Sequence, residues 1–169
     1  WVHKKEKENA TTKAMEMVAM AVAKARLLTP LTPSHLKLEN KALVIGGGIA
    51  GMTAAASLAQ QGYVTHLVEK NARLGGLLNE LDTIAPSGIR AKDMIAAKER
   101  ELQLSGVHIH PGTSVEQIGG LVGDFSAHLS TGEDLRVGAL VIATGAAPCE
   151  PNEFDNGKDP RVFTNLQLE

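Results

Sequence analysis

The residues best suited to chemistry in this sequence form a glycine-rich turn at residues 46–51, Gly-Gly-Gly-Ile-Ala-Gly. Gly46 permits a tight turn after a strand, Gly48 lets main chain approach a pyrophosphate, and Gly51 lets a helix pack closely on a sheet. Main-chain N–H groups at the start of that helix would donate to phosphate oxygens, aided by the helix dipole. The spacing therefore predicts a dinucleotide site.

A carboxylate follows the turn at a suitable distance, because Glu69 lies 18 residues after Gly51. At the end of a second strand it would accept hydrogen bonds from an adenosine ribose and would repel a 2′-phosphate, which disfavours NADP. The alternative is a glycine turn without a ligand and a solvated Glu69. The fingerprint is shared by FAD and NAD sites, so it does not separate the two cofactors.

The glycine turn is positioned by the elements around it. Residues 41–45 form a short apolar run, residues 49–61 are rich in alanine and leucine before Gly62, and residues 64–68 form a second apolar run. This order predicts strand, helix and strand, with Gly62 as the helix C-cap and with parallel strands.

The later segments extend this pattern. A helix is expected at residues 89–104 from its apolar spacing, and further strands at residues 107–110, 114–118, 125–130, 135–137 and 139–143. Gly119 and Gly120 punctuate the middle group. The sequence thus predicts an α/β fold: a Rossmann-like parallel sheet with an inserted antiparallel β-meander, preceded by an N-terminal helix.

The N-terminal helix is expected at residues 11–28, where apolar residues recur every three or four positions. Prolines then place a connector at residues 29–40. We expect two parts: residues 1–40 with the helix and the connector, and residues 41–169 with the nucleotide-binding domain. The helix docks either on that domain or on a partner, including a second copy of the chain.

Composition argues against several other classes of function. The chain has 169 residues, 43% of them hydrophobic, and a formal net charge of −2, which disfavours binding to nucleic acid or to a membrane surface. Cys149 is the only cysteine, so it has no partner in the chain for a disulfide or a cluster. His108 and His110 share a strand face, but we expect surface histidines and no metal site.

Three segments together resemble a known family. Residues 46–69, the Arg73-Leu74-Gly75-Gly76 segment and Ala143-Thr144-Gly145 are similar to the FAD domain of two-dinucleotide-binding flavoproteins of the thioredoxin and glutathione reductase type. The resemblance implies an FAD site, no catalytic side chain in this part, and a truncated domain that encloses the flavin poorly. The implied cofactor contacts are Gly46, Gly48, Ile49, Ala50, Gly51, Glu69, Lys70, Gly75, Gly76, Val115, Thr144 and Gly145.

A closer resemblance is to the A subunit of heterodisulfide reductases, carried by residues 1–4, 20–28, 42–52, 68–70 and 156–166. It implies a cytoplasmic flavin and iron–sulfur oxidoreductase subunit that works with the other subunits of its complex. The [4Fe-4S] clusters would be bound by cysteines of the parent outside this chain. Since the chain begins at Trp1 without Met, we expect a piece of that parent, in which FAD is weakly held or lost.

Two other functions remain open. The chain could be the NAD-binding domain of a dehydrogenase, although no hydride-handling residues stand in a recognisable arrangement. It could also be a non-catalytic Rossmann-like module that assembles with partner subunits and binds no nucleotide. The electron donor, the electron acceptor and the oligomeric state do not follow from the sequence.

Overall fold

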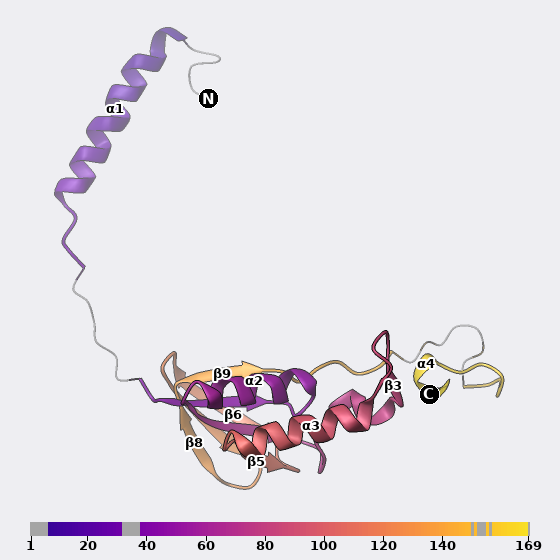
Figure 1. The fold of residues 1–169 in the computed structure, drawn as a ribbon. Coiled ribbons are helices and arrows are strands. Elements are labelled where there is room, and N and C mark those ends of the chain that lie inside the picture. The colour runs from indigo at the N-terminus through magenta and orange to yellow at the C-terminus, as the bar shows by residue number, and fades with distance from the viewer. Residues whose placement is uncertain (1–6, 32–37, 150, 152–154, 156, 169) are drawn as a thin grey trace. The chain divides into compact units, whose positions relative to one another are not determined.

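The apolar runs on either side of the glycine turn form neighbouring parallel strands. A computed structural model of the chain describes residues 7–31, 38–149, 151, 155 and 157–168 (Figure 1). In it, β1 (Lys41–Ile45) pairs with β2 (Val64–Glu69) on one side and with β9 (Ala139–Ile142) on the other, while β2 pairs with β5 (His108–Pro111). All three pairings are parallel, and the strand order is β5-β2-β1-β9. The predicted parallel sheet is confirmed.

Two helices cover one face of this sheet. They are α2 (Ile49–Gln60) and α3 (Ala91–Leu104), which contact each other. Because side chains alternate along a strand, β1 and β2 each send every second residue toward these helices. The resulting helix-side core consists of Val44, Met52, Ala55, Ala56, Leu67, Leu74 and Leu102.

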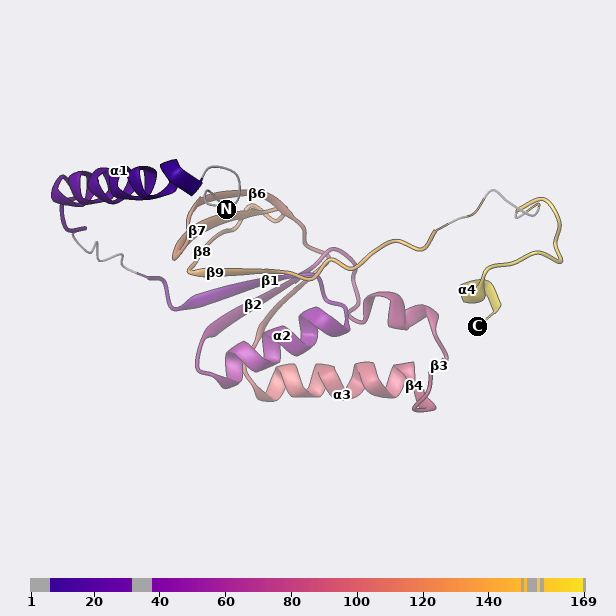
Figure 2. The ribbon, with the colours of Figure 1, turned by 90° about the horizontal axis from the view of Figure 1, so that it is seen from above.

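An antiparallel meander covers the other face, as Figure 2 shows. Its strands are β6 (Val115–Leu121), β7 (Asp124–Leu129) and β8 (Asp134–Val137), paired in that order. The meander-side core consists of Leu43, Val68, Ala127, Leu129, Leu135 and Val137. The predicted insertion is therefore a layer of the fold, and the sheet is packed on both faces.

Several element boundaries differ from the sequence predictions. The helix expected from residue 89 begins at Ala91, because Ile89–Arg90 instead form strand β4, which pairs with β3 (Thr83–Ile84). The amide of Ala91 donates to the carbonyl of Asp82 at 2.8 Å, which places the helix start beside this hairpin. The short elements η2 (Gly76–Glu80, a 3₁₀ helix) and α4 (Asn165–Leu168) were not predicted either.

The glycines at 119 and 120 do not end a strand. Both lie within β6, where Gly119 is opposite Ser126 and Gly120 is opposite Phe125. Gly120 has φ +94°, and a Cβ there would lie 2.2 Å from the carbonyl oxygen of Asp124. The glycine is thus needed for close approach inside the hairpin, and the prediction that it punctuates the chain was wrong.

The N-terminal helix α1 runs over Lys7–Arg26, four residues earlier at its start than predicted and two residues shorter at its end. The amides of Leu27 and Leu28 donate to the carbonyls three residues before them, a tighter turn that closes the helix. The chain divides into two units, Trp1–His35 and Leu36–Glu169. Residues 32–37 of the predicted connector lie outside the described part of the chain.

Every described helix is too short or too polar to cross a lipid bilayer.

The helix-side core should contribute strongly to the stability of the larger unit. Leu67 is fully buried in it, whereas Leu121 is 75% exposed at the end of β6. We predict that Leu67→Ala lowers the free energy of unfolding by about 2–5 kcal/mol, because it removes apolar contacts and leaves a cavity. Leu121→Ala should change it by less than about 0.5 kcal/mol. Urea denaturation of both variants checks this, and equal effects would contradict the assigned core.

Candidate functional site

The glycine turn links β1 to α2 and is held by main-chain contacts. The amide of Gly46 donates to the carbonyl of Val68 at 2.8 Å, so the turn is bonded to the end of β2. Gly46 has φ +108°, and a Cβ there would lie 2.4 Å from the carbonyl oxygen of Ala143. A side chain is excluded by both conformation and space, as a tight turn off the strand requires.

Gly51 brings the first turn of α2 against the sheet. It is buried, and a Cβ on it would lie 1.8 Å from the carbonyl oxygen of Gly46 and 3.5 Å from the Cβ of Ala143. Any larger residue would push the helix away from the β1 end. The predicted role of Gly51 in close packing is what the geometry shows.

Gly48 differs from these two glycines because its Cβ position is open. It is the N-cap of α2, with φ −72° and ψ 179°, a conformation that any residue adopts, and a Cβ there would meet nothing within 4 Å. Ile49 and Ala50 follow it on the exposed first turn. The first N–H groups of a helix have no partner within the helix, so they are available to an anion at this open position.

Glu69 is buried beneath the turn and is only 5% exposed. One carboxylate oxygen accepts a hydrogen bond from the amide of Gly47 at 2.6 Å, and the other accepts one from the amide of Asn71 at 2.8 Å. Gly47 is the residue of the turn to which the sequence pattern assigned no role, and a Cβ on it would lie 2.9 Å from the Cβ of Glu69. Glu69 therefore fixes the turn itself, and a contact with a ribose would use its remaining lone pairs.

The second glycine pair lies against the first. The amide of Gly75 donates to the carbonyl of Gly47 at 2.8 Å, and Gly75 forms an isolated parallel bridge with Gly48. Gly75 and Gly76 have φ of +110° and +52°, and a Cβ on Gly76 would lie 3.2 Å from the Cα of Gly48. Two segments more than 20 residues apart thus form one glycine-lined surface.

The other predicted contacts lie on neighbouring loops and on β6. Lys70 is exposed directly after Glu69, and the amide of Thr113 bonds the carbonyl of Glu69, so the loops after β2 and β5 meet. Val115 is half-buried and packs against the meander-side core. The exposed residues Thr144 and Gly145 follow Ala143, whose amide bonds the carbonyl of Ile45 and whose carbonyl faces Gly46.

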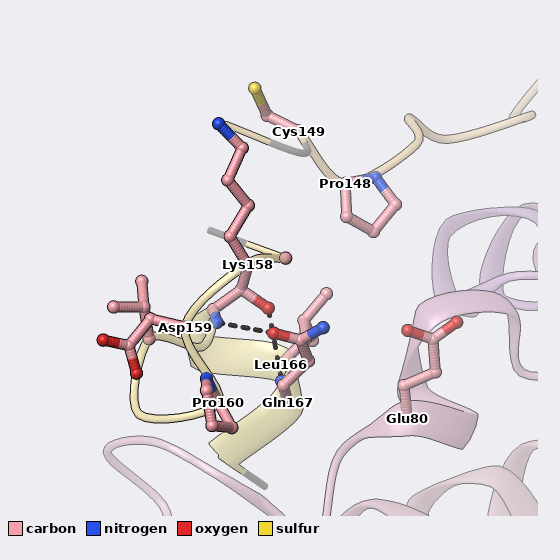
Figure 3. A pocket seen from close by; sticks show the side chains of 11 residues that line it. Glu80, Pro148, Cys149, Lys158, Asp159, Pro160, Leu166 and Gln167 are labelled. Carbon is pink, nitrogen blue, oxygen red and sulfur yellow. Dashed lines mark hydrogen bonds between the residues drawn. The ribbon is translucent and has the colours of Figure 1, made fainter. Parts of the chain in front are cut away.

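A pocket of about 500 Å³ elsewhere is lined by Glu80 and by the C-terminal segment (Figure 3). It includes Cys149, which is exposed and free, and Figure 3 shows Lys158 extending toward that cysteine. None of the residues 46–51 lines it. The glycine-lined surface and this pocket are therefore separate features.

The histidines form a stack that the sequence pattern revealed only in part. His108 and His110 lie on β5, and His66 of the neighbouring strand β2 stacks on both, with ring centroids 5.0 and 5.4 Å away. His66 Nδ1 lies 3.1 Å from His110 Nε2, and His110 Nδ1 lies 3.8 Å from Glu133. Among the described residues, no group of three or more His, Cys, Asp or Glu is arranged to hold a metal ion.

Two solved structures that share this fold are oxidoreductases. Thioredoxin reductase from Lactococcus lactis superposes with a TM-score of 0.58 at 25% identity, covering 69% of this chain and 40% of that one. L-proline dehydrogenase from P. horikoshii has the same fold, with a TM-score of 0.56 at 23% identity over 62% of this chain and 22% of that one. Together with the glycine turn, the fold defines a Rossmann-type dinucleotide-binding domain of the oxidoreductases.

The family follows from the sequence comparison. Residues 31–157 match the model of the pyridine nucleotide-disulphide oxidoreductases, and the chain belongs to this family.

The curated relatives are the A subunits of heterodisulfide reductases, in agreement with the resemblance noted from the sequence. The chain is 36% identical, over 93% of its length, to the A subunit of the H(2):CoB-CoM heterodisulfide,ferredoxin reductase of Methanothermobacter marburgensis. It is 37% identical, over 99% of its length, to a protein of Archaeoglobus profundus that is similar to the A subunit of heterodisulfide reductase. It spans 25% of the length of each relative.

The histidine stack should make stability depend on pH. Burial lowers the pKa of His66 below its ordinary value of 6.5, and the neighbouring His108, His110 and Lys41 lower it further, while Glu133 raises it. The unfolded chain then binds more protons than the folded chain, so stability is present above pH 6.5 and is lost as the pH falls through the lower, folded-state pKa. We predict that His66→Gln flattens the loss of melting temperature between about pH 7.5 and pH 5.

The matched control for this titration is His128, a partly exposed histidine on β7 that bonds Asp134 at 2.7 Å. The slope of the His66 variant below pH 6.5 is compared with the slopes of His128→Gln and of the unmodified chain. Equal slopes for the His66 variant and the unmodified chain would contradict the assignment.

Proposed function

We propose that this chain is the FAD-binding portion of an oxidoreductase similar to the A subunit of heterodisulfide reductase. The observation that carries the proposal is the surface of Gly48, Gly75 and Gly76. Within it, the Cβ position of Gly48 is open, Gly48 is the N-cap of α2, and Gly75 and Gly76 lie against it. Phosphates are bound at such helix starts because main-chain N–H groups and the helix dipole both favour negative charge.

The surrounding residues fit the parts of FAD on either side of its pyrophosphate. Gly46, Gly48, Ile49, Ala50 and Gly51 would hold the phosphates. Glu69, Lys70 and Val115 would lie on the adenosine side, where the loops after β2 and β5 meet. Gly75 and Gly76 would face the phosphate–ribityl side, with Thr144 and Gly145 beside the turn.

When bound, FAD supplies the redox chemistry, and the protein supplies position and electrostatics. The work of this chain is to orient the ADP half. The buried Glu69 holds the amide of Gly47 and, as a carboxylate, opposes a 2′-phosphate on the nucleotide. No catalytic side chain is proposed within it.

The parent protein is proposed to work in the cytoplasm with the other subunits of a heterodisulfide reductase-like complex. The relative from M. marburgensis is named as a subunit of a heterodisulfide and ferredoxin reductase, and the chain spans a quarter of its length. Because Cys149 is the only cysteine here, [4Fe-4S] clusters would be bound by other parts of the parent. A second copy of the chain could pack on α1, where Met15, Val18 and Met20 are each more than 60% exposed.

The role of the glycine turn in FAD binding can be tested by a substitution that adds one methyl group. We predict that Gly48→Ala weakens FAD binding about tenfold or more, because the methyl group would occupy the open Cβ position at the N-cap of α2, where the proposed phosphates would bind. Its stability should change little, since Gly48 has backbone angles that alanine adopts and no neighbour within 4 Å. Isothermal titration calorimetry measures the affinity, and urea denaturation measures the stability.

A second glycine provides a control that separates the site from the fold. Gly132, in the turn between β7 and β8, has φ +85°, and its Cβ position is open. Gly132→Ala should cost about 1–2 kcal/mol of stability through backbone strain and leave FAD affinity unchanged. Unaltered FAD binding by the Gly48 variant would remove the turn from the site.

Competition distinguishes the proposal from its alternatives. We predict that ADP displaces FAD from the chain, that NADH displaces it much more weakly, and that NADPH is the weakest because Glu69 opposes the 2′-phosphate. Calorimetric displacement titrations measure the order. NADH binding ahead of FAD would favour a dehydrogenase domain. Failure of FAD, ADP and NAD to raise the melting temperature of the full-length protein would favour an assembly module.

A further inference from the structure

The segment that contains Gly75 and Gly76 is hydrogen-bonded by one side chain, Asn79. Asn79 lies in η2, and its Nδ2 donates to the carbonyl of Leu74 at 2.9 Å and to the carbonyl of Gly76 at 3.1 Å. These two carbonyls stand on either side of Gly75. A single amide group thus bridges the turn that contains both glycines.

Contacts from neighbouring residues matter for this turn because two adjacent glycines give it a flexible backbone. Gly75 and Gly76 are both in the left-handed region, with φ of +110° and +52°. Glycine adopts such angles at little steric cost but loses more conformational freedom on folding than any other residue, so contacts that fix both glycines help to order the turn. The Asn79 amide supplies such contacts from one side, and the bond from the Gly75 amide to the Gly47 carbonyl supplies one from the other.

The chemistry of asparagine suits this position. Its NH₂ group carries two hydrogens, one for each carbonyl. Leucine has a similar size but no donor, and aspartate would place charged oxygens beside the carbonyl oxygens of Leu74 and Gly76. The Asn79 Nδ2 also lies 2.8 Å from the position of a Cβ on Gly75, so the side chain packs into the space that this glycine leaves.

We propose that Asn79 is a positioning residue that holds Gly75 and Gly76 against Gly48 and so sets the phosphate–ribityl side of the FAD site. The proposal rests on the proposed function. Asn79 does not touch the nucleotide; it acts through the carbonyls of Leu74 and Gly76. Substitution of Asn79 should therefore weaken the binding of FAD, which extends past the second phosphate, more than the binding of ADP, which ends there.

The test compares FAD and ADP on the same variants. Asn79→Leu removes both donors at nearly constant size without adding charge, and it should weaken FAD binding about five- to tenfold and ADP binding less than about twofold. Asn79→Ala should act in the same direction. Gln117→Leu, on the exposed face of β6, is the matched control and should change neither affinity. Calorimetry gives both affinities for each variant.

Each outcome has a distinct meaning. A lower FAD-to-ADP affinity ratio in both Asn79 variants supports the proposal. Equal losses for FAD and ADP would overturn it, because they indicate a general loss of structure, and unchanged FAD affinity in either variant would overturn it as well. The Gly48→Ala variant distinguishes failure of the FAD site from failure of the positioning role. If Gly48→Ala loses FAD binding and the Asn79 variants do not, the site stands and only the positioning role of Asn79 is refuted.

Discussion

The contact on which the rest of this domain depends is the pair of hydrogen bonds from main-chain amides to the buried carboxylate of Glu69. The carboxylate at the end of β2 accepts from Gly47 in the turn after β1 and from Asn71 in the loop after β2. Since Gly47 in turn accepts a bond from Gly75, the same contact extends to the second glycine pair. One side chain therefore connects the turn after β1 with the loop after β2, which also contains Gly75, and α2 begins directly after that turn.

Much of this architecture could be predicted from the sequence, because in most elements the local pattern of apolar residues matches the packing in the folded domain. Strand β1 has the predicted bounds, Gly62 follows the end of α2 with φ +90°, and each meander strand overlaps its predicted range. The exceptions are set by contacts from distant residues. The two-residue strands β3 and β4 are defined by their pairing with each other, and the start of α3 is set by a hydrogen bond to the Asp82 carbonyl. The spacing of apolar residues along the sequence does not reveal such pairings.

The candidate site, like the fold, could be predicted only in part. The roles of Gly46 and Gly51 could be derived from the fingerprint, since both concern sterics within one strand–turn–helix unit. The partnership of Glu69 with Gly47 could not, although the third glycine in a row was a visible clue. His66 joined His108 and His110 only because the parallel register places it opposite His108. Asn79 carried no sequence signature at all, because its partners are carbonyls that every residue possesses.

Strand β1 has a consequence for how the domain forms. Its neighbouring residues Leu43 and Val44 are both fully buried, one in the meander-side core and the other in the helix-side core. A slip of this strand by a single residue would exchange the two side chains and mispack both layers at once. The pairing of β1 with β2 and β9 is thus the event that couples the two layers, so that the helices and the meander are expected to gain their order together as one cooperative unit.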